Sequence, residues 1–151
     1  MSKKSIILIV AAALIVIAAV VARFCLRDTD VVGVTSYPNK NTVVLCCKSG
    51  SEFVNGSGSV TVGEGEYIHL EYALQSGSFD SALHAGDGSL DVFRDADMTK
   101  LPETAEDGGV FGTSGVSGKG GVDYEVAPGS YTVFFTIHDT VGKATVSVRK
   151  K

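Results

Sequence analysis

The chain of 151 residues contains no tryptophan and only three prolines, three cysteines and three histidines. Three cysteines are too few for the disulfide framework that stabilises many small secreted folds. Neither a Cys-x-x-Cys pair nor a cluster of cysteines and histidines occurs, which argues against a structural zinc site. A single bridge from Cys25 to Cys46 or Cys47 stays open, but burial of the adjacent pair on a strand is the more common arrangement.

Signatures of catalysis are also scarce. The sequence has no Gly-x-Ser-x-Gly motif in a strand-to-helix context, and so no nucleophile elbow. The three histidines, His69, His84 and His138, fall in segments with a strand pattern and without metal-ligand spacing. We therefore expect no catalytic residue, no cofactor and no metal. A small hydrolase or metal-dependent enzyme is the remaining alternative, because two carboxylates distant in sequence can converge in space.

The N-terminus carries an uncharged apolar run of 17 residues, Ile6–Ala22, between Lys4 and Arg23. As a helix it would reach roughly 26 Å, which is long for a secretory signal and short for a comfortable membrane span. We expect residues 1–27 to be an uncleaved signal-anchor that holds the chain in the membrane. A cleaved signal peptide is the alternative.

Charge supports an exported domain behind this leader. All 17 acidic residues follow Arg27, whereas four of the 13 basic residues lie at or before it, so the remainder carries a net charge of −8. Such a domain repels nucleic acid at long range. We expect a single-pass protein of the cell membrane with its C-terminal domain outside, or a protein secreted after signal cleavage.

Most of the chain beyond the leader shows the two-residue hydrophobic period of β-strands. The period is clearest in 66–75, 79–85 and 144–149, and Leu90 with Val92 also fit it. The residues expected to face the core are Ile68, Leu70, Tyr72, Leu74, Ala144, Val146 and Val148, and those expected to face solvent include Tyr67, His69, Glu71, Thr145 and Arg149.

Turn signals such as Asn55-Gly56, Ser76-Gly77 and the stretch from Asp139 to Gly142 lie between these segments. No helical pattern intervenes. The sequence therefore predicts an all-β fold, an antiparallel β-sandwich or jelly roll of about eight or nine strands. We assign it to residues 43–151, with 28–42 as a short stalk or as the lead-in to the first strand.

One segment, 95–121, has little periodicity and ends in a glycine- and serine-rich stretch, so we expect disorder or a mobile flap there. Carboxylates are the oxygen ligands that calcium prefers. The spacing of the carboxylates does not match a calcium loop. In a loop that begins at Asp87, Met98 stands where the bidentate acid would be. The weak metal candidates are Asp91, Asp95, Asp97, Glu103, Glu106 and Asp107.

The segment Ala127-Pro128-Gly129-Ser130-Tyr131-Thr132-Val133, followed by a turn at 141–143 and a last strand, resembles the closing hairpin of many bacterial extracellular Ig-like and carbohydrate-binding sandwiches. The resemblance implies an architecture and no functional residue.

The function that these features favour is a non-catalytic interaction module at the bacterial cell surface, with an extracytoplasmic protein or glycan as its partner. A carbohydrate-binding module is the alternative. It would need exposed aromatic side chains for sugar stacking. The aromatic candidates are Tyr37, Tyr67, Tyr124 and Phe111.

Overall fold

The computed structural model describes residues 32–49, 55–86, 90–104 and 108–151. The apolar run Ile6–Ala22, and with it the expected membrane segment, lies outside the described residues, as do Cys25, Glu106 and Asp107. Within the described ranges, no helix is long and apolar enough to cross a membrane.

The described part of the chain is mostly β-structure, and every strand pair is antiparallel, as the two-residue period predicts. The strands number seven rather than eight or nine, and they belong to one hydrogen-bonded sheet. The elements are β1 (Gly33–Tyr37), the 3-10 helix η1 (Pro38–Lys40), β2 (Thr42–Cys47), β3 (Asn55–Val62), β4 (Glu66–Ala85), the helical turn α2 (Asp91–Arg94), β5 (Phe111–Val116), β6 (Lys119–Tyr124) and β7 (Gly129–Lys150).

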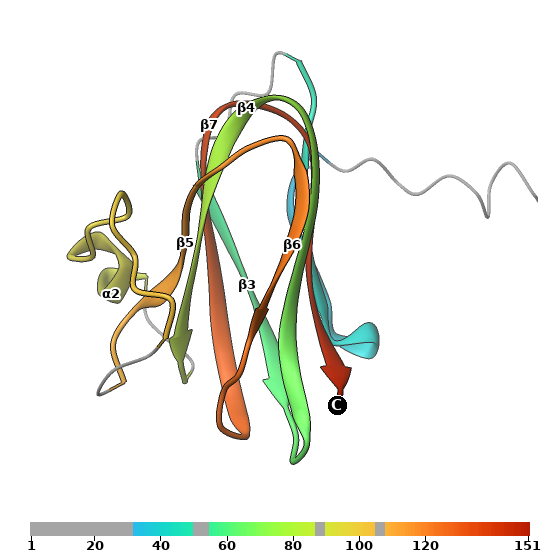
Figure 1. Ribbon diagram of the computed structural model, residues 1–151, viewed down its shortest axis with the longest axis vertical. Coiled ribbons are helices and arrows are strands. Elements are labelled where there is room, and N and C mark those ends of the chain that lie inside the picture. Colours follow the sequence, from blue (N-terminus) through green and yellow to red (C-terminus); the bar gives the residue numbers. More distant parts are fainter. Residues whose placement is uncertain (1–31, 50–54, 87–89, 105–107) are drawn as a thin grey trace, which may run out of the picture. The chain divides into compact units, whose positions relative to one another are not determined.

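Two long strands, β4 and β7, organise the sheet. They pair with each other over their whole length, from Glu66 opposite Lys150 to Ala85 opposite Tyr131. β2 and β3 follow the other edge of β7, β5 and β6 follow the other edge of β4, and β1 is added to β2 as a hairpin. Both long strands arch over in the middle (Figure 1).

The arch coincides with irregularities in the ladder. The register of β4 shifts between Leu74 and Ser78. At Gly77, φ is +75°, and a Cβ atom would lie 2.3 Å from the carbonyl oxygen of Asp139, so only glycine fits there. The signals at Ser76-Gly77 and 139–142 therefore bend β4 and β7 instead of ending them, which explains the lower strand number.

The arch divides the sheet into two halves, which we name by whether another segment of the chain packs on the outer face. The bare half contains β1, β2 and β6 with residues 66–74 of β4 and 141–150 of β7. The covered half contains β3 and β5 with residues 76–85 of β4 and 129–138 of β7.

The hydrophobic core lies between the two halves. A Cβ atom on Gly58 of β3 would lie 2.7 Å from Cγ1 of Val43 on β2, so these strands meet across the interior. Phe79 and Phe135 pack edge to face, with ring centroids 5.8 Å apart. Burying one such side chain contributes about 1.5–3 kcal/mol. The largest fully buried residues are Phe79, Phe111, Phe135, Leu45, Ile68, Leu70, Leu83, Val43, Val60, Val133 and Val146.

The inward positions predicted for β4 and for the end of β7 are confirmed. Ile68, Leu70, Ala144 and Val146 are buried, and Tyr72, Leu74 and Val148 pack partly buried against the same core. Cys46 and Cys47 lie on β2 as free thiols. Burial of the pair is confirmed for Cys47 only: adjacent strand residues face opposite sides, and Cys46 is half-buried.

Two local predictions are wrong. Leu90 and Val92 do not belong to a strand: Leu90 precedes α2, and Val92 lies within it. The second half of the segment 95–121 is not a flap, because it forms β5 and the start of β6. Its glycines permit close strand packing: a Cβ on Gly112 would lie 2.0 Å from the Ser81 carbonyl oxygen.

The residues before β5 cover the outer face of the covered half over β4 and β7, whereas the outward residues of β3, such as Ser57, stay exposed. Phe93 of α2 is buried and stacks on Phe134 of β7, with ring centroids 5.1 Å apart and planes at 14°. Residues 98–102 line the edge of β5, where the N–H of Gly112 donates to the carbonyl of Pro102. Figure 1 shows α2 and its flanking turns beside β5, on the side away from β6.

Candidate binding groove

Four of the acidic residues singled out in the sequence, Asp91, Asp95, Asp97 and Glu103, lie in the described ranges, and they form no metal-binding cluster there. Asp91 forms an exposed ion pair with Arg94 at 3.3 Å. Asp97 accepts hydrogen bonds from the hydroxyl and the N–H of Thr99, and these lower the pKa of its carboxyl. Asp95 and Glu103 are exposed. The described ranges contain no group of three or more side chains able to hold a metal ion.

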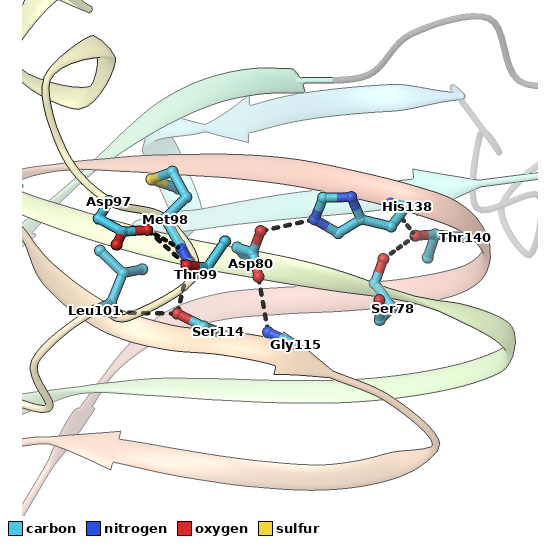
Figure 2. Close-up of polar contacts among 10 residues, drawn as sticks. All are labelled: Ser78, Asp80, Asp97, Met98, Thr99, Leu101, Ser114, Gly115, His138 and Thr140. Carbon is cyan, nitrogen blue, oxygen red and sulfur yellow. Dashed lines mark hydrogen bonds and ion pairs between the residues drawn. The ribbon is translucent and has the colours of Figure 1, made fainter.

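A polar cluster around Asp80 and His138 lies near the arch, beside the segment that precedes β5 (Figure 2). Asp80 of β4 is buried and accepts a hydrogen bond from the N–H of Gly115 on β5 at 2.7 Å. Its other oxygen lies 2.7 Å from Nε2 of His138, whose side chain is 53% exposed. The pair therefore joins β4, β5 and β7.

Two hydroxyl groups near this pair, those of Thr140 and Ser114, form hydrogen bonds with backbone groups. Thr140 donates to the carbonyl of Ser78, and Ser114 donates to the carbonyl of Met98 while accepting from the N–H of Leu101. Figure 2 shows Thr140 joining β7 to β4 and Ser114 joining β5 to the loop before it. Such bonds hold a buried fold together, so this cluster is best explained as structural.

The outer face of the bare half is different. Strand register places outward side chains in rows across the sheet, because the side chains of a strand alternate between its faces. One row contains Ser147, His69 and Asp123, on β7, β4 and β6. The next rows contain Thr145, Glu71 and Gly121, and then Lys143, Ala73 and Lys119.

These rows form a surface groove of about 650 Å³. Its centre carries small residues, Ala73, Gly121 and Thr145, and longer polar side chains surround them. Gly121 makes room for a ring: a Cβ atom there would lie 3.2 Å from Cε1 of His69. The groove thus depends on a glycine in β6 opposite a histidine and a glutamate in β4.

Two polar pairs order the side chains at one end of the groove. Nδ1 of His69 lies 2.5 Å from a carboxylate oxygen of Asp123, which leaves Nε2 as the ring nitrogen not engaged by that pair. Arg149 lies 3.4 Å from Glu71 across the strands, with both side chains largely solvent-exposed. Exposed pairs of this kind contribute little to stability.

The groove carries a small excess of positive charge, in contrast to the chain after Arg27 as a whole. Its lining includes Lys119, Lys143 and Arg149 and one acidic residue, Glu71, and Asp123 adds a second carboxylate beside His69. The chain after Arg27 carries −8. A local excess of one charge sign in a concave surface attracts ligands of the other sign.

The sequence predicted part of this site. Alternation placed Tyr67, His69 and Glu71 on the outer face, and their strand does present them there. Alternation also placed Arg149 on the outer face, whereas Lys119 and Lys143 carried no signal of their own. The three cations are separated in sequence and meet only through the pairing of β4 with β6 and β7.

The aromatic residues considered for sugar stacking divide into two pairs. Phe111 and Tyr124 are core residues that pack edge to face at 5.9 Å. Tyr37 and Tyr67 are half-buried. Apart from the partly buried Tyr72, the groove lining offers charged and hydrogen-bonding groups rather than aromatic rings. Comparison with known protein families, with curated proteins and with solved structures found no match to this chain.

Proposed function

We propose that this chain is a non-catalytic interaction module of the cell envelope, a β-sandwich-like domain formed by the bent sheet and presented outside the cell. Ile6–Ala22 would hold it in the membrane as a single-pass anchor, or residues 1–27 would be removed and the domain secreted. The apolar run and the charge difference on its two sides support this location.

The observation that carries the proposal is the difference between the two outer faces. The covered half is closed by Phe93 and the segment around it. The bare half keeps a groove of about 650 Å³ whose charged side chains add little to folding stability. Exposed charged residues gathered in a concavity are better explained by binding than by stability.

A glycan-binding module remains the second candidate, and the polar lining of the groove favours it. Glu71, Thr145 and His69 provide hydrogen-bonding groups of the kind that sugar hydroxyls need.

The binding surface can be tested with a photoreactive amino acid incorporated at Thr145 on the bare half or at Ser57 on the exposed face of β3. In intact cells that make the protein, we expect the probe at Thr145 to cross-link an envelope component and the probe at Ser57 not to do so. Equal cross-linking from both positions, or none from Thr145, would contradict the proposed surface.

The location has its own test. Protease added outside intact cells should digest the domain, and intact-mass measurement of the membrane-extracted protein should find Met1–Ala22 retained. A soluble mature form lacking residues 1–27 would support secretion instead of anchoring. Protection of the domain from external protease would overturn the extracytoplasmic proposal.

A further inference from the structure

We infer that the ligand of the groove is an acidic polysaccharide, a hydroxyl-rich chain with widely spaced carboxylates. This inference rests on the proposed function and specifies the ligand of the same surface.

The charge of the groove indicates an anionic ligand. Lys119 and Lys143 stand at one end of the groove and Arg149 at the other. Two carboxylates oppose these three cations: Glu71, which is paired with Arg149, and Asp123, which is paired with His69. The net charge of the exported part is opposite in sign, so a densely charged polymer is repelled by the domain as a whole. A sparsely charged chain meets the local cations with less of this repulsion.

The spacing of the cations points the same way. Lys119 and Lys143 flank Ala73 in one row, about 10 Å apart at two inter-strand spacings. Arg149 lies six residues beyond Lys143 on β7, roughly 20 Å along the strand. Phosphates in a nucleic acid strand recur about every 3.4 Å. The groove is therefore matched to a polymer with far fewer charges per length.

The groups between the cations suit hydroxyls. Glu71 can accept two hydrogen bonds, and the Thr145 hydroxyl can donate or accept. His69 is held at Nδ1 by Asp123, so its Nε2 is the nitrogen that can serve a ligand. The carboxylate of Glu71 repels the groups of a ligand that carries only anions, but it can accept hydrogen bonds from the hydroxyls of a sugar.

An extended peptide fits less well. In the bare half, β4 pairs with both β6 and β7, and β7 pairs with both β4 and β2, so their backbone groups are already hydrogen-bonded. A peptide cannot join these two strands as an additional strand, which is the usual way an extended backbone is recognised by a sheet. Among the described residues, β1 and β6 each pair with one strand, so strand addition is confined to those edges, and across β4 and β7 the face offers side chains only.

The test uses the full chain in detergent and measures binding to hyaluronan oligosaccharides, which carry a carboxylate on every second sugar, by calorimetry. Neutral dextran, carboxyl-reduced hyaluronan, polyglutamate and polygalacturonate, which carries a carboxylate on every sugar, are the comparison ligands. We expect hyaluronan binding that weakens as salt rises, weaker binding of polygalacturonate, and no binding of dextran or of the carboxyl-reduced form.

Matched variants locate the site. Lys119→Glu should weaken binding about tenfold or more, whereas Lys119→Arg, which keeps the charge, should bind within about threefold of the unaltered chain. Lys100→Glu makes the same charge change on the segment beside the covered half and should have no such effect. Circular dichroism verifies that each variant is folded.

The outcomes separate the two proposals. Failure of hyaluronan to bind, binding of polygalacturonate as tight as that of hyaluronan, equal binding of the carboxyl-reduced form, or equal loss in Lys119→Glu and Lys100→Glu would overturn the inference. Binding of polyglutamate as tight as that of hyaluronan would replace it with an acidic protein ligand. Any of these results leaves the cross-linking at Thr145 as an independent measure of whether the face binds at all.

Discussion

The two halves of the bent sheet use polar residues in opposite ways. In the covered half, Asp80 is buried and bonded to Gly115 and His138, so its carboxylate holds strands together. In the bare half, Glu71 and Arg149 are exposed and loosely paired at 3.4 Å. The comparison teaches that in this fold the charged residues important for stability and those available for binding occupy different outer faces.

The largest expected difference between the halves concerns two glycines. Gly112→Ala in the covered half should destabilise the fold by about 3 kcal/mol or more, because φ is +150° and the new Cβ would meet a backbone oxygen at 2.0 Å. Gly121→Ala in the bare half should cost about 1 kcal/mol, since its new Cβ would lie 3.1 Å from the Leu70 carbonyl oxygen and 3.2 Å from the His69 ring, which can move. Urea unfolding followed by circular dichroism measures both. Equal losses of unfolding free energy in the two variants would contradict the expected difference between the two glycines.

A second comparison concerns the two carboxylates. Asp80→Ala leaves the N–H of Gly115 and the ring of His138 without their partner, and we expect a loss of about 2–3 kcal/mol. Glu71→Ala should change the free energy of unfolding by less than about 0.5 kcal/mol. If Glu71→Ala proved as damaging as Asp80→Ala, the bare face would be structural and the proposed binding role would lose its basis.

A third prediction concerns the contact between the halves. Burial raises the pKa of Tyr124 to about 12, and its hydroxyl hydrogen-bonds to that of Thr113 on β5. Unfolded tyrosine releases its proton near pH 10. The folded state therefore holds the proton more tightly, and this contribution is present below pH 10 and lost as pH rises through 12. The loss amounts to about 2–3 kcal/mol.

Unfolding free energies measured from pH 9 to 11.5 check this prediction, with Tyr124→Phe as the comparison. The unaltered chain should lose stability more steeply than the variant over that window. Parallel pH profiles would show that Tyr124 does not titrate differently in the folded and unfolded states.

The smallest expected effect concerns the neighbouring thiols, which face opposite sides of the bare half. Burial, together with the neighbouring Cys46, raises the pKa of Cys47 to about 11, so only about one thiol in a thousand is ionised at pH 8. In a Cys25→Ser chain, iodoacetamide should modify the half-buried Cys46 at least tenfold faster than Cys47 until the fold is unfolded. Equal rates, read by peptide mass spectrometry, would contradict the assigned faces.

Much of the fold could be predicted where the period of two is strict. The alternation in β4 placed Ile68 and Leu70 in the core and His69 outside, because burial on one face selects apolar side chains at every second position. The same reasoning held at Ala144 and Val146 in β7.

The rest could not be predicted, for physical reasons that differ between segments. Gly77 and its surroundings carry the chemistry of a turn, but that chemistry also permits a bend within a paired strand. β5 and β6 are poor in strand-forming residues, and their pairing with β4 overrides local preference. Lys119 and Lys143 are neighbours across Ala73 only after three strands have paired, which no local pattern reports.

The continuous pairing of β4 with β7 has a further consequence for cooperativity. Because the same two strands run through both halves, neither half can open without disturbing the ladder of the other. We expect amide hydrogens of the two halves to exchange with solvent in one common event rather than in two separate ones. A ligand held on the bare face would then slow exchange in the covered half as well, although it touches no atom there.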